Sequence, residues 1–133
     1  MVERIFPADI KVLDSVTAFL EEELEKAECS PKFVMTFAVA LEELFVNVAH
    51  YAYPDSSGTV TIGIDTTGDS VVIRLADSGI PFNPLAKADP DVTLSAEERK
   101  IGGLGIFMVK KSMDNMDYEY RDGKNILTIS KRK

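Results

Sequence analysis

The chain has 133 residues and little of three things: cysteine, positive charge and long apolar runs. Its single cysteine, Cys29, excludes a disulfide within the chain and favours a reducing compartment. No basic region followed by an apolar run opens the sequence, so no signal peptide is expected. No segment approaches the roughly 20 apolar residues that a membrane-spanning helix needs. Together these absences predict a cytoplasmic protein.

Positive charge is scarce, because 15 Lys and Arg residues are outnumbered by 22 Asp and Glu residues, which gives a net charge of −7 at pH 7. Nucleic-acid affinity rests largely on the neutralisation of phosphates by Lys and Arg, so this balance argues against DNA or RNA as a partner. An anionic membrane would be repelled in the same way, and the basic segment 131–133 is too short to reverse the field. A single bound nucleotide is compatible with this charge, since a few local donors suffice to hold it.

The composition is that of one globular domain, with 45% hydrophobic and 28% charged residues. Apolar residues recur at helical spacing in two long segments, and β-branched residues alternate in several short ones. The pattern predicts an α+β fold: a two-layer α/β sandwich in which helices cover one face of a mixed, mainly antiparallel sheet. The predicted elements are a strand at 2–6, helices at 9–28 and 31–51, strands at 59–65 and 70–76, a loop at 77–101, a helix at 106–113, and strands at 116–121 and 125–131.

Two polar residues interrupt the apolar pattern of the segment 31–51. Glu43 and Asn47 are four residues apart, so they form a stripe of their own beside the buried apolar stripe of the helix. A charged Glu at such a boundary needs a partner, which favours a pair that binds a ligand. The alternative is a solvated helix edge on which Glu43 and Asn47 hydrogen-bond to each other. Glu42 is expected to be an ordinary solvated residue.

A second candidate is Asp77-Ser78-Gly79, where a strand rich in Val and Ile runs into the long loop. A carboxylate at a strand end can accept hydrogen bonds from an amino group, and a glycine two residues later permits the close approach of a flat ligand. The alternative is an ordinary turn, since Asp, Ser and Gly are all common turn residues.

A third candidate is Gly102-Gly103-Leu104-Gly105, directly before the last predicted helix. A glycine-rich entry into a helix presents free backbone N–H groups and the positive end of the helix dipole, which together bind phosphate. The segment is not a Walker A loop, because no Gly-Lys-Ser or Gly-Lys-Thr follows, and it is not a Rossmann fingerprint, because a loop precedes it. The alternative is a flexible hinge.

The order of these features resembles the Bergerat-fold ATPases: an acid and an amide four apart on a helix, Asp-x-Gly after a strand, a lid-length loop and a glycine-rich helix start. That superfamily includes type II topoisomerases, heat-shock-90 chaperones, histidine kinases and MutL-type repair proteins. Within it, the chain resembles the bacterial anti-sigma factor serine kinases and anti-sigma regulatory factors. The resemblance covers nearly the whole chain, including PFNPL at 81–85, GGLGIFMVKKSMD at 102–114 and DGKNILTISK at 122–131.

The resemblance implies a role for each candidate residue. Glu43 would be the base that polarises the attacking hydroxyl or water, and the Asn47 amide would ligate a Mg²⁺ ion that bridges the phosphates. Asp77 would accept the amino group of adenine, and Gly79 would leave room beneath the ring. Phosphoryl transfer needs alignment and charge neutralisation more than covalent help, so such a set can be sufficient.

The resemblance also assigns the loop, the glycine box and the last strand. The segment 85–101 would form a lid over the nucleotide, and Thr128 would help to close the adenine pocket. The amides that bind phosphate would come from Gly102, Gly103, Leu104 and Gly105.

One departure from the family pattern is Ile101, which stands where family kinases often have an Arg, with Arg99 and Lys100 slightly earlier. The resemblance implies ATP and Mg²⁺ as cofactors and a STAS-domain anti-anti-sigma protein whose serine is phosphorylated. It also implies a sigma factor that is sequestered, a phosphatase as a further partner and a homodimer. Ile101 favours an alternative, a nucleotide-dependent binding module without kinase activity that controls a phosphatase or a response regulator. A third alternative is a structural α+β domain with no ligand.

Overall fold

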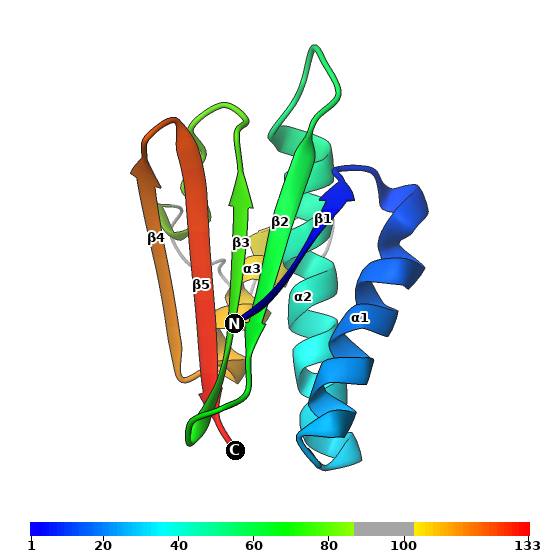
Figure 1. Cartoon of the computed structure of the whole chain (residues 1–133). Coiled ribbons are helices and arrows are strands. Elements are labelled where there is room, and N and C mark those ends of the chain that lie inside the picture. The colour runs from blue at the N-terminus through cyan, green and yellow to red at the C-terminus, as the bar shows by residue number, and fades with distance from the viewer. Residues whose placement is uncertain (87–102) are drawn as a thin grey trace.

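The computed structural model describes residues 1–86 and 103–133, which form a five-stranded sheet with helices on one of its faces (Figure 1). This arrangement confirms the α+β sandwich that the sequence predicts. No described helix covers the other face of the sheet, which points toward the viewer in Figure 1. In chain order the elements are the strand β1 (Val2–Pro7), the 3-10 helix η1 (Ile10–Val12), the helices α1 (Leu13–Lys26) and α2 (Pro31–Tyr51), the strands β2 (Thr59–Asp65) and β3 (Ser70–Asp77), the 3-10 helix η2 (Pro84–Ala86), the helix α3 (Gly103–Ser112), and the strands β4 (Asn115–Arg121) and β5 (Lys124–Arg132).

The strands lie in the order β1-β2-β3-β5-β4, and each neighbouring pair in the described part of the chain is antiparallel. The sheet that was expected to be mixed is therefore antiparallel throughout that part. Because β5 lies beside β3, the end of one strand meets the start of the other, and Asp77 is opposite Asn125. The β4–β5 hairpin turns at Asp122 and Gly123, whose φ angles of 54° and 75° are the left-handed values that a tight hairpin turn needs.

The helix starts follow local capping chemistry. The Ser30 hydroxyl accepts a hydrogen bond from the Phe33 N–H at 3.2 Å, and Pro31 occupies the first position of α2, as the sequence predicts. The first helix begins later than predicted. The Asp9 carboxylate accepts a hydrogen bond from the Lys11 N–H at 2.9 Å, so it caps the 3-10 turn η1, and α1 follows from that turn.

Helix α2 corrects one expectation from the sequence. It has 21 residues and a mean hydropathy of 1.4, so by length and composition alone it could cross a membrane. A buried helix in the core of a globular domain meets the same criterion, and α2 contributes five residues to the core. These are Phe37, Ala40, Leu41, Leu44 and Phe45.

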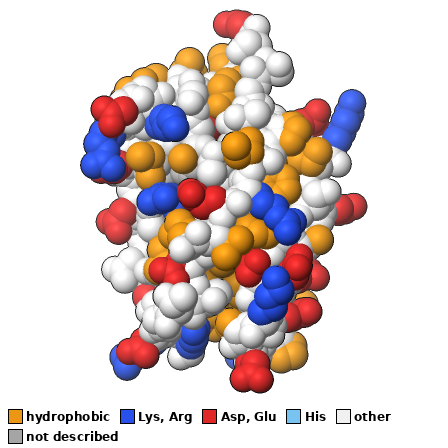
Figure 2. Space-filling model, viewed as in Figure 1, with side chains coloured by type: hydrophobic (Ala, Val, Ile, Leu, Met, Phe, Trp, Pro, Cys, Tyr) orange, Lys and Arg blue, Asp and Glu red, His pale blue; other side chains and the backbone are white. Residues whose placement is uncertain are grey.

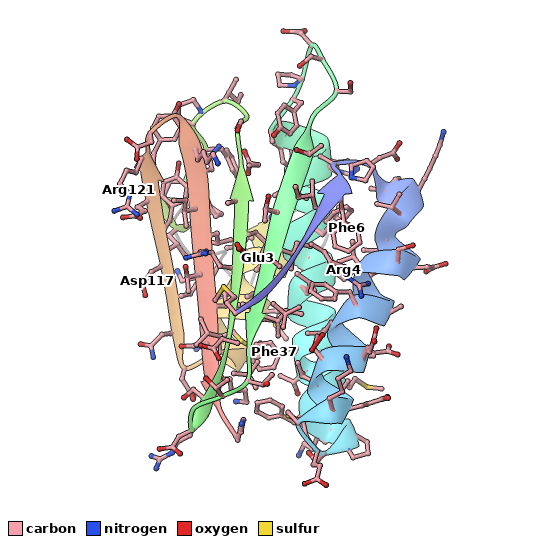
Figure 3. All side chains as sticks on the ribbon, in the orientation of Figure 1. Glu3, Arg4, Phe6, Phe37, Asp117 and Arg121 are labelled. Carbon is pink, nitrogen blue, oxygen red and sulfur yellow. The ribbon has the colours of Figure 1, made fainter. Side chains whose placement is uncertain are left out.

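The core lies between the sheet and the helices. Phe6 and Phe37, which Figure 3 labels, enter this layer from β1 and α2 and are buried. The ring of Phe6 packs against that of Phe19 in α1, with centroids 6.0 Å apart. Burial of these large side chains fixes α2 against the sheet, and it thereby fixes the edge of α2 that carries Glu43 and Asn47.

The open face of the sheet carries charged side chains of both signs among hydrophobic ones (Figure 2). Arg74 and Glu3 form an exposed ion pair there, with 3.4 Å between nitrogen and oxygen. Thr128 is paired with Arg74 and with Asp117, and it alternates along β5 with the buried Leu127, so its side chain lies on this open face. The prediction that Thr128 closes the adenine pocket is therefore wrong, because the β5 side chains that face the helices are those in phase with Leu127.

Candidate functional site

The edge of α2 carries the predicted acid and amide. Glu43 and Asn47 are half-buried, whereas Glu42 faces solvent. Within the described part of the chain, no hydrogen bond or ion pair engages the side chain of Glu43 or Asn47. The structure therefore does not contain the alternative that the sequence left open, a Glu43–Asn47 hydrogen bond along a solvated edge. A half-buried carboxylate and a half-buried amide are instead available to a ligand.

A groove of about 590 Å³ lies between α2 and α3, and both Glu43 and Gly105 line it. A Cβ atom added at Gly105 would overlap the Glu43 carboxylate, so a glycine allows the first turn of α3 to approach the acid this closely. Three apolar side chains of the groove are more than half exposed: Met35, Val39 and Met108. The structure thus brings the predicted base to the predicted phosphate-binding turn.

Helix α3 begins at Gly103, earlier than the predicted start at Ile106, so Gly103, Leu104 and Gly105 form its first turn. The N–H groups of a first helical turn have no partner within the helix, and they lie at the positive end of the helix dipole. The earlier start places the three predicted phosphate-binding amides in the position that suits an anion.

Three predictions concern residues outside the described part of the chain. They are Gly102 of the glycine box, Ile101 before it, and the lid at 85–101, of which the structure describes only Leu85 and Ala86 as part of η2. They stay predictions.

A smaller cavity, the nucleobase cavity, lies further along α2 at the end of β3. It has about 40 Å³ of free space, and the buried Asp77 contributes to its wall. Asn47 borders this cavity, one helical turn from Glu43 in the groove. The rings of Tyr51 and Phe82 also line it and are stacked, with centroids 5.6 Å apart and 23° between their planes. A largely apolar space with one buried acid suits a nucleobase.

Asn125 of β5 connects the polar groups of the nucleobase cavity, and the sequence prediction missed it. Its side chain is 6% exposed. The Nδ2 group donates to Asp77 Oδ1 at 2.9 Å and to the Ile80 carbonyl at 2.8 Å. The Oδ1 atom accepts from the Phe82 N–H at 3.0 Å and from the Tyr118 hydroxyl. All four hydrogen-bonding positions of the amide are therefore used.

A signal for Asn125 was present in the sequence. It is in phase with Leu127 and Ile129 on the side of β5 that faces the core, where a polar side chain needs partners. Its partner Tyr118 is half-buried. Burial raises the pKa of the Tyr118 hydroxyl, and the negative charge of Asp77 adds to the rise. Tyr118 is therefore a protonated donor to Asn125 at neutral pH.

Gly79 has a different reason for being glycine from the one predicted. Its N–H donates to Asp77 Oδ1 at 2.9 Å, and the next N–H, that of Ile80, donates to the Ala52 carbonyl at 2.9 Å. A Cβ atom at Gly79 would overlap that same Ala52 carbonyl, which is backbone at the end of α2. Gly79 thus allows the loop after β3 to pack on α2, and the room that it leaves is occupied by protein backbone.

The donor set fits ATP and Mg²⁺. The described residues hold no cluster of three or more His, Cys, Asp or Glu side chains for a metal. Mg²⁺ keeps several waters and binds through one or two protein groups plus nucleotide phosphates. The Asn47 oxygen can supply such a group. At Asp77, both donors from the described chain bind Oδ1, so Oδ2 is left to accept a hydrogen bond from a base.

Two curated relatives are protein kinases. The chain is 24% identical over 102 residues to the serine/threonine-protein kinase BtrW of Bordetella bronchiseptica, and this alignment covers 76% of the chain and 72% of the kinase. It is 28% identical over 93 residues to the serine-protein kinase RsbW of Bacillus mycoides, which covers 67% of the chain but 58% of that kinase. The chain therefore spans less than two thirds of the Bacillus relative.

Solved structures and a family model show the same fold. The structure of the RsbU and RsbW domains of a Mycobacterium tuberculosis protein superposes with a TM-score of 0.64 at 15% identity, over 99% of this chain and 32% of that one. The SiaB–SiaC complex of Pseudomonas aeruginosa gives 0.59 at 17% identity, over 98% and 89%. The model of the histidine kinase-like ATPase domain matches residues 6–131, which include the acid–amide edge of α2, Asp77 and the first turn of α3. The chain belongs to the histidine kinase-like ATPase family.

Proposed function

We propose that this chain binds ATP with Mg²⁺ and transfers the γ-phosphate to a serine of a protein partner. One observation carries the proposal: the Glu43 carboxylate, without a partner among the described residues, lies against the first turn of α3. An acid placed beside phosphate-binding amides can accept a proton where a phosphate is transferred. The serine kinases among the relatives support the same reaction class.

The nucleotide would lie along α2 from the nucleobase cavity to the groove. Asp77 Oδ2 would accept the adenine amino group, while Tyr51 and Phe82 shield the ring from water. The amides at the start of α3 would bind the phosphates, and the Asn47 oxygen would hold Mg²⁺. Bound Mg²⁺ would neutralise the negative charge on the phosphate oxygens.

The transfer itself needs one protein base. The serine hydroxyl would approach the γ-phosphorus through the groove, and its proton would pass to the Glu43 carboxylate. A bond between the serine oxygen and the γ-phosphorus forms as the bond from that phosphorus to the bridging oxygen of ADP breaks. The products are a phosphoserine, ADP and one proton, held first by Glu43.

The partner follows from the family resemblance of the sequence. We infer a STAS-domain anti-anti-sigma protein as the carrier of the serine, and a sigma factor that the chain sequesters. A homodimer and a cytoplasmic location belong to the same proposal. The excess of acidic residues supports regulation through protein contacts rather than through DNA.

The test is a transfer assay with ATP labelled at the γ-phosphate, Mg²⁺ and a STAS-domain protein from the same organism. We expect label on the partner with the unmodified protein, and none with Glu43→Ala, although Glu43→Ala still binds ATP. Transfer that persists in Glu43→Ala would remove Glu43 from the mechanism. If ATP and Mg²⁺ fail to raise the melting temperature, the chain is a structural domain, since a ligand of the native state must stabilise it.

A second candidate function rests on Ile101, which replaces the Arg that family kinases often have before the glycine box. In that case the chain is a nucleotide-dependent binding module that controls a phosphatase or a response regulator. The same assay separates the two functions, because a binding module is stabilised by ATP but transfers no label.

A further inference from the structure

The nucleobase cavity contains a polar group that phosphate transfer does not use, the side-chain amide of Asn125. It is almost fully buried and belongs to β5, far along the chain from Glu43 and Asn47. A buried amide is costly unless every donor and acceptor is paired, and here all are. Its four partners lie at the end of β3, in the loop after β3 and in β4, which are the parts that shape the cavity.

The orientation of the amide is fixed by two backbone partners. The Phe82 N–H can only donate, so it must meet the oxygen of Asn125, and the Ile80 carbonyl can only accept, so it must meet the nitrogen. In a flipped amide, the nitrogen would face the Phe82 N–H, donor against donor, and the oxygen would face the Ile80 carbonyl, acceptor against acceptor. The second hydrogen of Nδ2 is thereby directed to Asp77 Oδ1, at 2.9 Å.

This fixed donor determines what Asp77 offers to a base. Oδ1 already accepts hydrogen bonds from the Asn125 side chain and from the Gly79 N–H. These two bonds fix the orientation of the carboxylate. Oδ2 has no partner in the described part of the chain and acts only as an acceptor. The cavity therefore presents one hydrogen-bond acceptor in a fixed position.

A fixed acceptor distinguishes the two purines. Adenine carries an amino donor at position 6, where guanine carries a carbonyl acceptor. A mobile carboxylate could turn to the N1–H and the 2-amino group of guanine, but one that is held by Asn125 and Gly79 cannot follow. A guanine would then leave buried acceptors facing each other, which is strongly disfavoured.

We propose that Asn125 is a positioning residue that makes this site selective for adenine over guanine nucleotides, because it holds Asp77 as a fixed acceptor. The inference rests on the proposed nucleotide site and adds to it the residue that sets base specificity. Asn125 acts through Asp77 and needs no contact of its own with the base.

The test compares the dissociation constants of Mg-ATP and Mg-GTP by calorimetry. The unmodified protein should prefer ATP. In Asn125→Asp, which keeps the acceptor for the Phe82 N–H but removes the donor to Asp77, the ratio of the GTP to the ATP dissociation constant should fall by at least about tenfold. Asn125→Ser, which introduces no charge but removes the amide donor to Asp77, should lower the same ratio and serves if Asn125→Asp does not fold. Thermal unfolding identifies the folded variants.

A purely structural role would give a different result. It would weaken ATP and GTP binding by the same factor and leave the ratio unchanged, and this outcome in a folded variant overturns the proposal. Tyr118→Phe removes a hydrogen bond from the other side of the same amide, so it should keep the ratio. Asn83→Ala removes the solvent-exposed acceptor of the Leu85 N–H, a hydrogen bond of 2.9 Å, and should also leave the ratio of dissociation constants unchanged.

Failure of the inference can be told apart from failure of the proposed function. If the unmodified protein binds neither nucleotide, the nucleotide site itself is wrong. If it binds ATP and the ratio does not change in folded Asn125 variants, only the role of Asn125 is wrong.

Discussion

At the nucleobase end of the site, Asp77 and Asn125 are 7% and 6% exposed and hydrogen-bond to each other. At the phosphate end, Glu43 and Asn47 are half-buried, and their side chains bond to no described residue. The first end is largely completed by the fold, because among its described polar groups only Asp77 Oδ2 is left without a partner. The second end leaves its polar groups available, and under the proposed function they would bond to nucleotide and partner.

This contrast separates stability from activity. Substitutions at the nucleobase end should lower the free energy of unfolding together with affinity, since they leave buried groups unpaired or displace backbone. Substitutions at the phosphate end should lower the rate of transfer and leave stability nearly unchanged.

The largest effect is expected from Glu43→Gln, which keeps the shape of the side chain and removes its ability to accept a proton. The rate of phosphate transfer should fall by roughly 10² to 10⁴-fold, as for loss of a general base. ATP affinity and the free energy of unfolding should change little. Single-turnover transfer measures the rate and urea unfolding measures the free energy of unfolding. The matched control is Glu42→Gln, at a solvated position. A loss of stability as large as the loss of rate would contradict the contrast.

Gly79→Ala tests the nucleobase end. Its Cβ would overlap the backbone carbonyl of Ala52, so either the loop or the end of α2 must move. We expect a loss of about 2–3 kcal/mol in the free energy of unfolding, in the range found for overpacking. Gly68→Ala is the control, because nothing lies within 4 Å of a Cβ there. Equal stability of the two variants would show that the loop does not depend on this close approach.

Asn47→Ala should weaken ATP binding by about tenfold when Mg²⁺ is present, because one protein ligand of the metal is lost. In the presence of a chelator, the variant and the unmodified protein should bind ATP equally, since the amide then has no metal to hold. Calorimetry in both conditions measures the difference. A defect of the same size without Mg²⁺ would assign Asn47 to the nucleotide rather than to the metal.

Gly105→Ala should have a smaller effect than the substitutions above. It should slow phosphate transfer while leaving the free energy of unfolding unchanged or slightly higher. Alanine favours a helix over glycine by up to about 1 kcal/mol, and the group that a Cβ would meet is the flexible end of Glu43, which can move aside. Stability should therefore stay the same or rise slightly. The displaced carboxylate should slow transfer by about threefold to tenfold. An unchanged rate would show that the position of Glu43 against α3 does not matter.

The smallest effect concerns pH. The pKa of Tyr118 is raised by burial, so the folded state holds this proton more tightly than the unfolded state. The stability that Tyr118 contributes is thus complete below its unfolded pKa, near 10.0, and is lost as pH rises through the higher folded value. Tyr118→Phe should reduce the fall in the free energy of unfolding above that pH, measured by urea unfolding at a series of pH values. An identical fall in the free energy of unfolding of the variant and the unmodified protein would contradict this role of Tyr118.

Local patterns were sufficient to place Glu43 and Asn47 on one edge of a helix and the glycine box at a helix start. The spacing of Glu43 and Asn47 follows from the helical period alone, and the glycine box marks a helix start by its composition. The predicted start of α3 is too late because Gly103 and Gly105 are poor helix formers. Their low propensity is overridden by packing of the first turn against Glu43.

The nucleobase end depends on contacts that no local pattern contains. Asp77 and Asn125 meet only because β5 is inserted beside β3, which is a property of the strand order. The need for glycine at position 79 comes from the close approach of the Ala52 carbonyl at the end of α2, which is distant in sequence. The prediction for Thr128 does not account for the alternation along β5, which places Asn125 on the helix side and Thr128 on the open side.

Helix α2 joins both ends of the site in one rigid body. It carries Glu43, and its end anchors the loop after Asp77 through the Ala52 carbonyl. At about 1.5 Å per residue, the helix separates these two points by about 13 Å along its axis. Under the proposed function, the distance from the base to the transferred phosphate would thus be set by the length of a helix and by no loop. One residue inserted between them would turn one end by about 100° against the other, so this segment can vary by substitution but hardly by insertion or deletion.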